Sequence, residues 1–109
     1  MTWNLRYLPD AIEDFLALDR RQRIAVEKAV QKVQQNPLPS NEGGYGKPLG
    51  KKRSRNLTNC LKIKLLREGL RVIYKLERTE NRMLVIVVGV RADEEVYDIA
   101  VSRIKKYNL

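Results

Sequence analysis

Five side chains in the second half of this sequence have the types that phosphate chemistry needs. Lys62 and Lys64 are separated by one residue in an alternating stretch, so they share one face of a predicted strand, away from the core. Arg71 follows after a short turn, which brings it near Lys64 if the two flanking strands pair. Arg91 ends the most apolar stretch, and Tyr97 lies six residues later. Each alone is typical of an exposed or packing position, but together they gather several cations and one aromatic ring.

The chemistry that suits this set is cleavage of RNA by the neighbouring 2′-hydroxyl group. A base removes the hydroxyl proton, cations neutralise the charge on the phosphorane, and a proton donor assists departure of the 5′-oxygen. Crowded ammonium groups lower each other's pKa, so one of Lys62 and Lys64 is a candidate base. Tyr97 offers a hydroxyl for proton transfer and a ring for stacking on a nucleobase. This route needs no metal or cofactor, and it leaves a 2′,3′-cyclic phosphate and a 5′-hydroxyl.

The composition narrows the chemistry further. The sequence has no histidine, which removes the usual general base and the Ser-His and Cys-His arrangements. Cys60 is the single cysteine, so an internal disulfide is impossible and a structural zinc site is effectively excluded. Acid–base chemistry must therefore come from Lys, Arg, Tyr, Asp or Glu.

The net charge of +9 is concentrated in one block of the chain. Residues 47–75 contain ten basic side chains and one acidic side chain, whereas residues 1–46 and 76–109 are each balanced. Such a concentration is typical of a surface that binds a polyanion. A plain solubilising surface is the alternative, but it seldom needs one sign of charge in one place.

Hydrophobic periodicity and breaker residues predict the elements that must position these side chains. A short strand over residues 3–7 precedes a helix that starts at Pro9, and a second helix runs over about 20–35. Residues 40–56, rich in glycine, predict a loop that carries candidate contacts to RNA or the ribosome: Lys47, Lys51, Lys52, Arg53 and Arg55. The rest should be three strands and a helix: 60–66, 70–76, 83–90 and 93–106.

This order, β-α-α-β-β-β-α, predicts an α+β fold with a small antiparallel sheet and helices packed on one face. The length suits a single domain over residues 1–109. No apolar run approaches the roughly 20 residues of a membrane span, and the first residues do not resemble a secretory signal. We therefore expect a cytoplasmic protein with no membrane partner.

Several short motifs in this sequence resemble the RelE toxin family, within the RelE/ParE superfamily. They extend over nearly the whole chain and are Tyr7-Leu8-Pro9-Asp10-Ala11, Cys60-Leu61-Lys62-Ile63-Lys64-Leu65, Gly69-Leu70-Arg71-Val72-Ile73-Tyr74, Val88-Gly89-Val90-Arg91 and Glu95-Val96-Tyr97. The resemblance implies the toxin of a type II toxin–antitoxin pair that cuts messenger RNA in the ribosomal A site. It implies partners as well: a cognate antitoxin, with which the chain forms a hetero-oligomer, and the ribosome.

The resemblance also implies roles for the five residues. Lys64 or Tyr97 is the base, Lys62 and Arg71 stabilise charge, and Arg91 acts as the acid or as a clamp on the transition state. Two positions depart from the family. Leu70 stands where an aromatic residue is frequent before the arginine, and Val90 stands where a further basic residue is common before Arg91.

Two alternative functions remain open. A gyrase-poisoning toxin of the ParE type shares the fold but has no need of Lys62, Lys64, Arg71, Arg91 and Tyr97. A plain basic RNA- or DNA-binding module would bind nucleic acid with a strong salt dependence and cut nothing. We therefore predict a metal-independent endoribonuclease ahead of these two alternatives.

Overall fold

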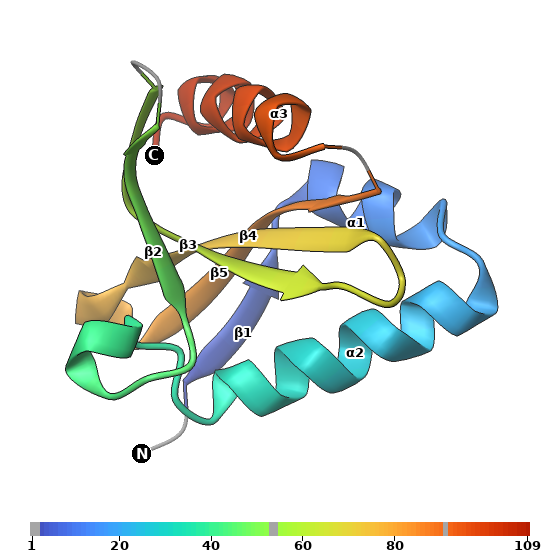
Figure 1. Ribbon diagram of the computed structural model, residues 1–109. Helices are drawn as coiled ribbons and strands as arrows, with labels where there is room; N and C mark the ends of the chain where they lie inside the picture. The colour runs from blue at the N-terminus through green and yellow to red at the C-terminus, as the bar shows by residue number, and fades with distance from the viewer. Residues whose placement is uncertain (1–2, 53–54, 91) are drawn as a thin grey trace.

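The computed structural model describes residues 3–52, 55–90 and 92–109. The described elements, in chain order, are β1 (Asn4–Tyr7), α1 (Pro9–Leu16), α2 (Arg20–Gln34), β2 (Lys47–Lys52), β3 (Arg55–Leu65), β4 (Leu70–Glu77), β5 (Arg82–Gly89) and α3 (Asp93–Lys106). The five strands form one sheet in the order β1-β5-β4-β3-β2, between helices (Figure 1). The predicted α+β class is confirmed.

The sheet is mixed rather than wholly antiparallel. Strands β3 to β5 form an antiparallel meander, as predicted, and β2 extends it at one edge, but β1 pairs with β5 in parallel. The sequence pattern of β1 predicts a strand without indicating its neighbour. Because α1 and α2 carry the chain across the molecule after β1, the first strand lies beside the last one rather than beside the next one.

The prediction of a loop over residues 40–56 is wrong in its second half. Residues 47–52 form the edge strand β2, which pairs with a β3 that begins at Arg55, five residues before the predicted start. Pro48 and Gly50 are strand breakers in a sequence, but an edge strand tolerates both, and the pairing register shifts between them. Gly50 has a φ of +60°, a left-handed conformation that glycine adopts without a steric penalty.

The helices cover both faces of the sheet, so the prediction of packing on one face is wrong. Alternation along the central strands sends Tyr74 toward the chain that follows α2, where its hydroxyl donates to the carbonyl of Pro37 at 2.8 Å. The same alternation sends Lys62 toward α3, where it meets Tyr97. Figure 1 shows α3 above the sheet and α2 below it. The two layers bury β5 on both faces, as its apolar sequence predicts.

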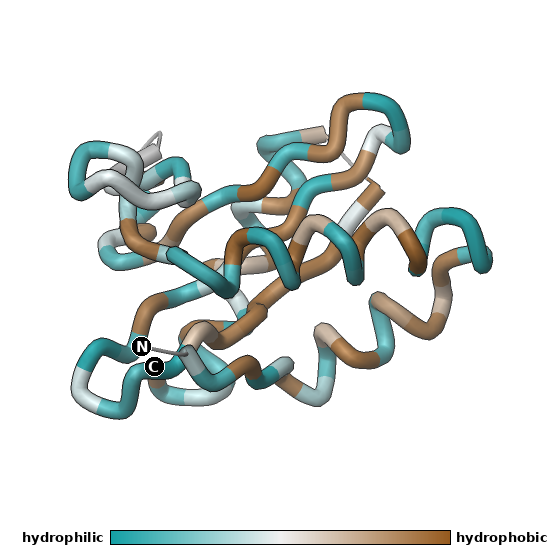
Figure 2. Tube along the Cα trace, turned by 90° about the horizontal axis from the view of Figure 1, so that it is seen from below, coloured by the Kyte–Doolittle hydropathy of each residue, from teal (hydrophilic) through white to brown (hydrophobic). Residues whose placement is uncertain are grey.

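Local signals account for where the helices begin. Pro9 is the first residue of α1, where its missing N–H is no loss. Asp19 caps α2 through a capping box with Gln22. Apolar stretches run through the strands at the centre, while the turns at the periphery are hydrophilic (Figure 2). None of the helices in the described part of the chain is both long enough and apolar enough to cross a membrane.

Candidate functional site

The β3–β4 hairpin brings two of the predicted site residues together. Lys64 lies directly across from Arg71 in the antiparallel register, as predicted from the turn between them. Gly69 has a φ of +64° in that turn, which favours glycine at this position. Lys62 lies two residues before Lys64 and therefore points to the same face of the sheet.

Helix α3 covers this face and buries Lys62. The Nζ atom of Lys62 donates to the hydroxyl of Tyr97 at 2.8 Å and lies 5.4 Å from the centroid of that ring. Both residues are only 6% exposed. The prediction that Lys62 faces away from the core is therefore wrong, because the strand alternation identifies a polar face but does not show that a helix packs on it.

Asp93, in the first turn of α3, completes the cluster. Its Oδ2 atom lies 3.3 Å from Nζ of Lys62, and its Oδ1 atom accepts a hydrogen bond from Nε of Arg71. One carboxylate thus joins two cations that come from neighbouring strands. Asp93 is not among the predicted site residues, because the helix dipole alone explains acidic residues at a helix start. The available signal was three consecutive acidic residues, 93–95, opposite a strongly basic hairpin.

Charge pairing within the cluster keeps Lys62 and Asp93 ionised. Burial alone would lower the pKa of Lys62, but hydrogen bonds to Tyr97 and Asp93 outweigh burial and raise the pKa above its usual value. Burial alone would raise the pKa of Asp93, but its bonds to Arg71 and Lys62 lower the pKa below the usual value. Lys62 is therefore an ammonium ion at neutral pH. The expectation that crowding lowers a lysine pKa does not hold for Lys62.

The other two predicted site residues are Lys64 and Arg91. The side chain of Lys64 is exposed, and it has no ion pair with any residue that the structure describes. Its position opposite Arg71 places it at the solvent side of the cluster. Arg91 lies outside the described residues.

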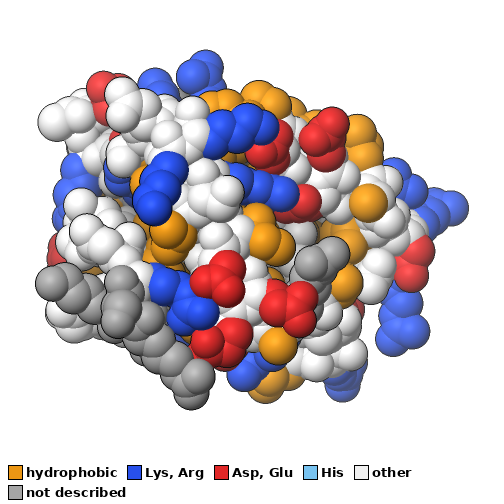
Figure 3. Space-filling model, turned by 90° about the horizontal axis from the view of Figure 1, so that it is seen from above, with side chains coloured by type: hydrophobic (Ala, Val, Ile, Leu, Met, Phe, Trp, Pro, Cys, Tyr) orange, Lys and Arg blue, Asp and Glu red, His pale blue; other side chains and the backbone are white. Residues whose placement is uncertain are grey.

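The described basic residues of the predicted loop lie on strands β2 and β3. Lys47 is exposed on β2, Lys51 and Lys52 belong to the same strand, and Arg53 lies outside the described residues. Arg55 donates to Asp98 at 2.5 Å and to Glu94 at 3.1 Å, and its side chain is only 18% exposed. Figure 3, which looks down on the α3 side, shows acidic side chains gathered among lysines and arginines. The acidic face of α3 therefore partly neutralises the basic strands beneath it.

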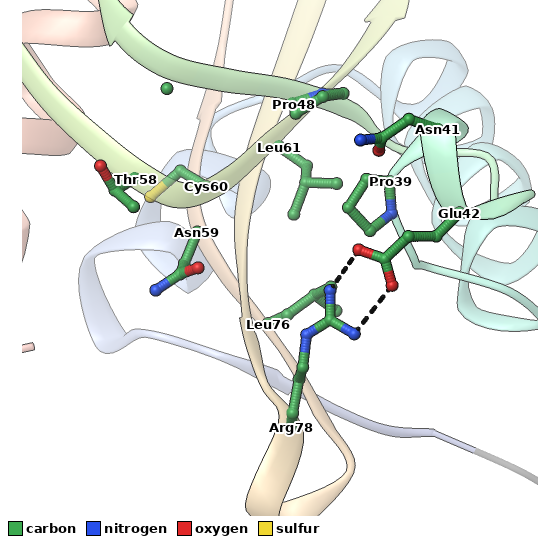
Figure 4. Close-up of a pocket in the computed structure, with 11 residues that line it drawn as sticks. Pro39, Asn41, Glu42, Pro48, Thr58, Asn59, Cys60, Leu61, Leu76 and Arg78 are labelled. Carbon is green, nitrogen blue, oxygen red and sulfur yellow. Dashed lines mark hydrogen bonds and ion pairs between the residues drawn. The ribbon is translucent and has the colours of Figure 1, made fainter.

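A separate hollow of about 210 Å³ lies at the other end of β3 and β4 (Figure 4). Arg78 closes part of its rim with a two-pronged pair to Glu42, at 3.0 and 2.8 Å. Cys60 lines the hollow, but burial raises the pKa of its thiol to about 11, so the reactive thiolate is scarce at neutral pH. None of the four predicted site residues that the structure describes lines it. The hollow is therefore separate from the cluster beneath α3.

No family model matches this chain. A putative RelE-like toxin protein of Escherichia coli is 26% identical over 106 residues, which cover 96% of this chain and 100% of that protein. A double mutant of the E. coli toxin RelE in the free state superimposes with a TM-score of 0.74 at 28% identity, covering 95% of this chain and 99% of RelE. The same mutant toxin in complex with an antitoxin RelBc peptide gives a TM-score of 0.70 at 26% identity, covering 92% and 95% of the two chains.

These similarities agree with the sequence motifs and with the fold. They extend over nearly the full length of this chain and of each relative, and they include sequence as well as fold. Lys62, Lys64 and Arg71 lie on one face of the hairpin. In both sequence and fold, this chain is therefore similar to RelE-like toxins.

Proposed function

We propose that this chain is the toxin of a type II toxin–antitoxin pair and a ribosome-dependent endoribonuclease. It cuts messenger RNA in the A site by attack of a 2′-hydroxyl on the adjacent phosphate, and translation stops. The observation that carries the proposal is the cluster beneath α3, where Lys62 and Arg71 converge and Tyr97 contacts Lys62. The similarity to RelE proteins over the whole chain supports it. We place the activity in the cytoplasm.

The raised pKa of Lys62 supports a role in charge stabilisation rather than in proton removal. Its ammonium and the guanidinium of Arg71 are fixed cations that neutralise the charge developing on the phosphorane. Lys64 and Tyr97 remain the two candidates for the base that takes the 2′-hydroxyl proton. Arg91 is proposed as a clamp on the transition state, or as the donor to the leaving 5′-oxygen.

An antitoxin is the expected partner of the free toxin. One structural relative is a RelE toxin in complex with an antitoxin RelBc peptide. For this chain we propose an acidic or amphipathic antitoxin segment that covers the basic strands or displaces α3. The exposed Lys47 on the edge strand is available to such a segment. A pull-down from the native operon that returned this protein alone would count against the partner.

Primer extension on a defined messenger in a purified translation system tests the nuclease directly. We expect wild-type protein to cut at A-site codons only when ribosomes are present. Arg71→Gln removes one fixed cation and should slow cutting about 100-fold. Arg20→Gln is the matched control, because Arg20 is an exposed arginine on α2 and its loss changes the net charge equally. Equal cutting by both variants would contradict the assignment of Arg71.

The ParE-like alternative predicts a different outcome of the same comparison. A gyrase poison would leave the messenger intact in every sample, and DNA breaks would accumulate when purified gyrase is added. Poisoning should then survive Arg71→Gln. A plain nucleic-acid-binding module would leave both RNA and DNA intact, and it would bind each with a strong salt dependence.

A further inference from the structure

Asp93 binds the two cations to which the proposed function gives the substrate phosphate. Its two carboxylate oxygens contact Nζ of Lys62 and Nε of Arg71. A phosphodiester presents two unbridged oxygens that share one negative charge, so it makes the same kind of charge-assisted hydrogen bonds. The carboxylate therefore satisfies the two cations in the way that a backbone phosphate of RNA would.

The burial of Lys62 leaves no room for a phosphate beside the carboxylate of Asp93. Lys62 is 6% exposed beneath Tyr97 and Asp93, so a phosphate oxygen has no open approach to its ammonium group. Contact between this ammonium and a phosphate requires the carboxylate of Asp93 to leave. Asp93 itself is 35% exposed at its side chain, so it lies at the surface where an exchange can begin.

The attachments of α3 allow such an exchange without loss of the helix. Val96 and Ala100 are fully buried and anchor the helix to the sheet through apolar contacts. Arg55 forms ion pairs with two other acidic residues of the helix, Glu94 and Asp98, and these pairs do not involve Asp93. Release of the Asp93 carboxylate therefore leaves the apolar anchor and the Arg55 ion pairs in place.

We propose that Asp93 is an internal competitor for the substrate phosphate and sets the affinity of this site for RNA. In the closed state its carboxylate holds Lys62 and Arg71, and RNA binds by replacing it. That the competing phosphate belongs to an RNA strand rests on the proposed function. The test measures binding alone and does not need cleavage.

The test compares Asp93→Asn with wild type in binding to a labelled single-stranded RNA of about 12 nucleotides, within the site size of small single-strand binders. All riboses of the probe carry 2′-O-methyl groups, which prevents cleavage by 2′-hydroxyl attack. Because a neutral amide holds the two cations less tightly, we expect the dissociation constant to fall roughly tenfold. The slope of log affinity against log salt should steepen by about 0.7 for each additional phosphate that the variant binds.

Glu27→Gln is the matched control. Glu27 is an exposed residue of α2 that makes no ion pair with the described residues, and its replacement changes the net charge by the same amount. Its affinity and salt slope should remain close to wild type. Circular dichroism during heating confirms that each variant is folded. If Asp93→Asn fails to fold, Asp93→Ser removes the same charge with a residue that is favoured at helix starts.

An affinity of Asp93→Asn no higher than that of Glu27→Gln would overturn the inference. Weaker binding would also overturn it and would make Asp93 a positioning residue for Lys62. The proposed nuclease can fail separately. If Asp93→Asn binds the probe more tightly while neither it nor wild type cuts messenger on ribosomes, the competition stands and the nuclease assignment falls.

Discussion

Replacing Lys62 with methionine separates the charge of this side chain from its volume. The Lys62 side chain is 6% exposed, and its ammonium group donates to Tyr97 and Asp93. Methionine fills a similar space, and Arg71 still neutralises Asp93. The lost hydrogen bonds are offset by the removed cost of burying a cation, so the free energy of unfolding should change by no more than about 2 kcal/mol. Loss of one fixed cation from the transition state should slow messenger cleavage about 100- to 1000-fold.

The assay measures primer-extension rates at saturating ribosomes and urea unfolding curves for the same preparations. Lys28→Met is the control, because Lys28 is exposed on α2 and its loss changes the net charge equally. We expect cleavage by this control to stay within about threefold of wild type, as expected for a remote surface change. Cleavage by Lys62→Met within threefold of wild type would refute the reasoning and leave Lys62 as a buried structural lysine. Failure of Lys62→Met to fold would refute the stability estimate.

Two further substitutions test interactions that hold the fold, and one pH comparison tests the electrostatics of the site. Tyr74→Phe removes the buried bond to the Pro37 carbonyl and should lower the free energy of unfolding in urea by about 1–2 kcal/mol; an unchanged midpoint would contradict this. Arg103→Met leaves the carboxylate of Asp14 without its two-pronged partner and should cost about 2 kcal/mol in the same assay. The lowered pKa of Asp93 contributes stability above its usual value near 3.8 that is lost as pH falls through the lowered value. Wild type should therefore lose more stability than Asp93→Asn between about pH 5 and pH 2, and parallel pH profiles would exclude this contribution.

The local pattern of the sequence predicts much of what positions the site. Alternation on both sides of a Gly-containing turn predicts the β3–β4 hairpin, and the hairpin alone places Lys64 opposite Arg71. Helical spacing predicts α3 over about 93–106, the range that the structure has. These features follow from neighbours in the chain, which is why the sequence is sufficient for them.

Long-range packing decides the rest of the fold. The strand β2 contains Pro48 and Gly50, whose local preferences oppose a strand, and it forms because β3 offers a free edge. Residue alternation is the same for a solvated sheet face and for one covered by a helix, so the sequence alone does not place α3 opposite α2.

The covered face explains what sequence reasoning missed at the site. A lysine in an alternating strand predicts an exposed ammonium group, and Lys62 is buried because Tyr97 and Asp93 arrive from an element more than 30 residues away. The residue types, the hairpin and the charge of this surface follow from the local sequence. That a carboxylate of the same chain binds its cations follows from where the last helix packs, which neighbours in the chain do not specify.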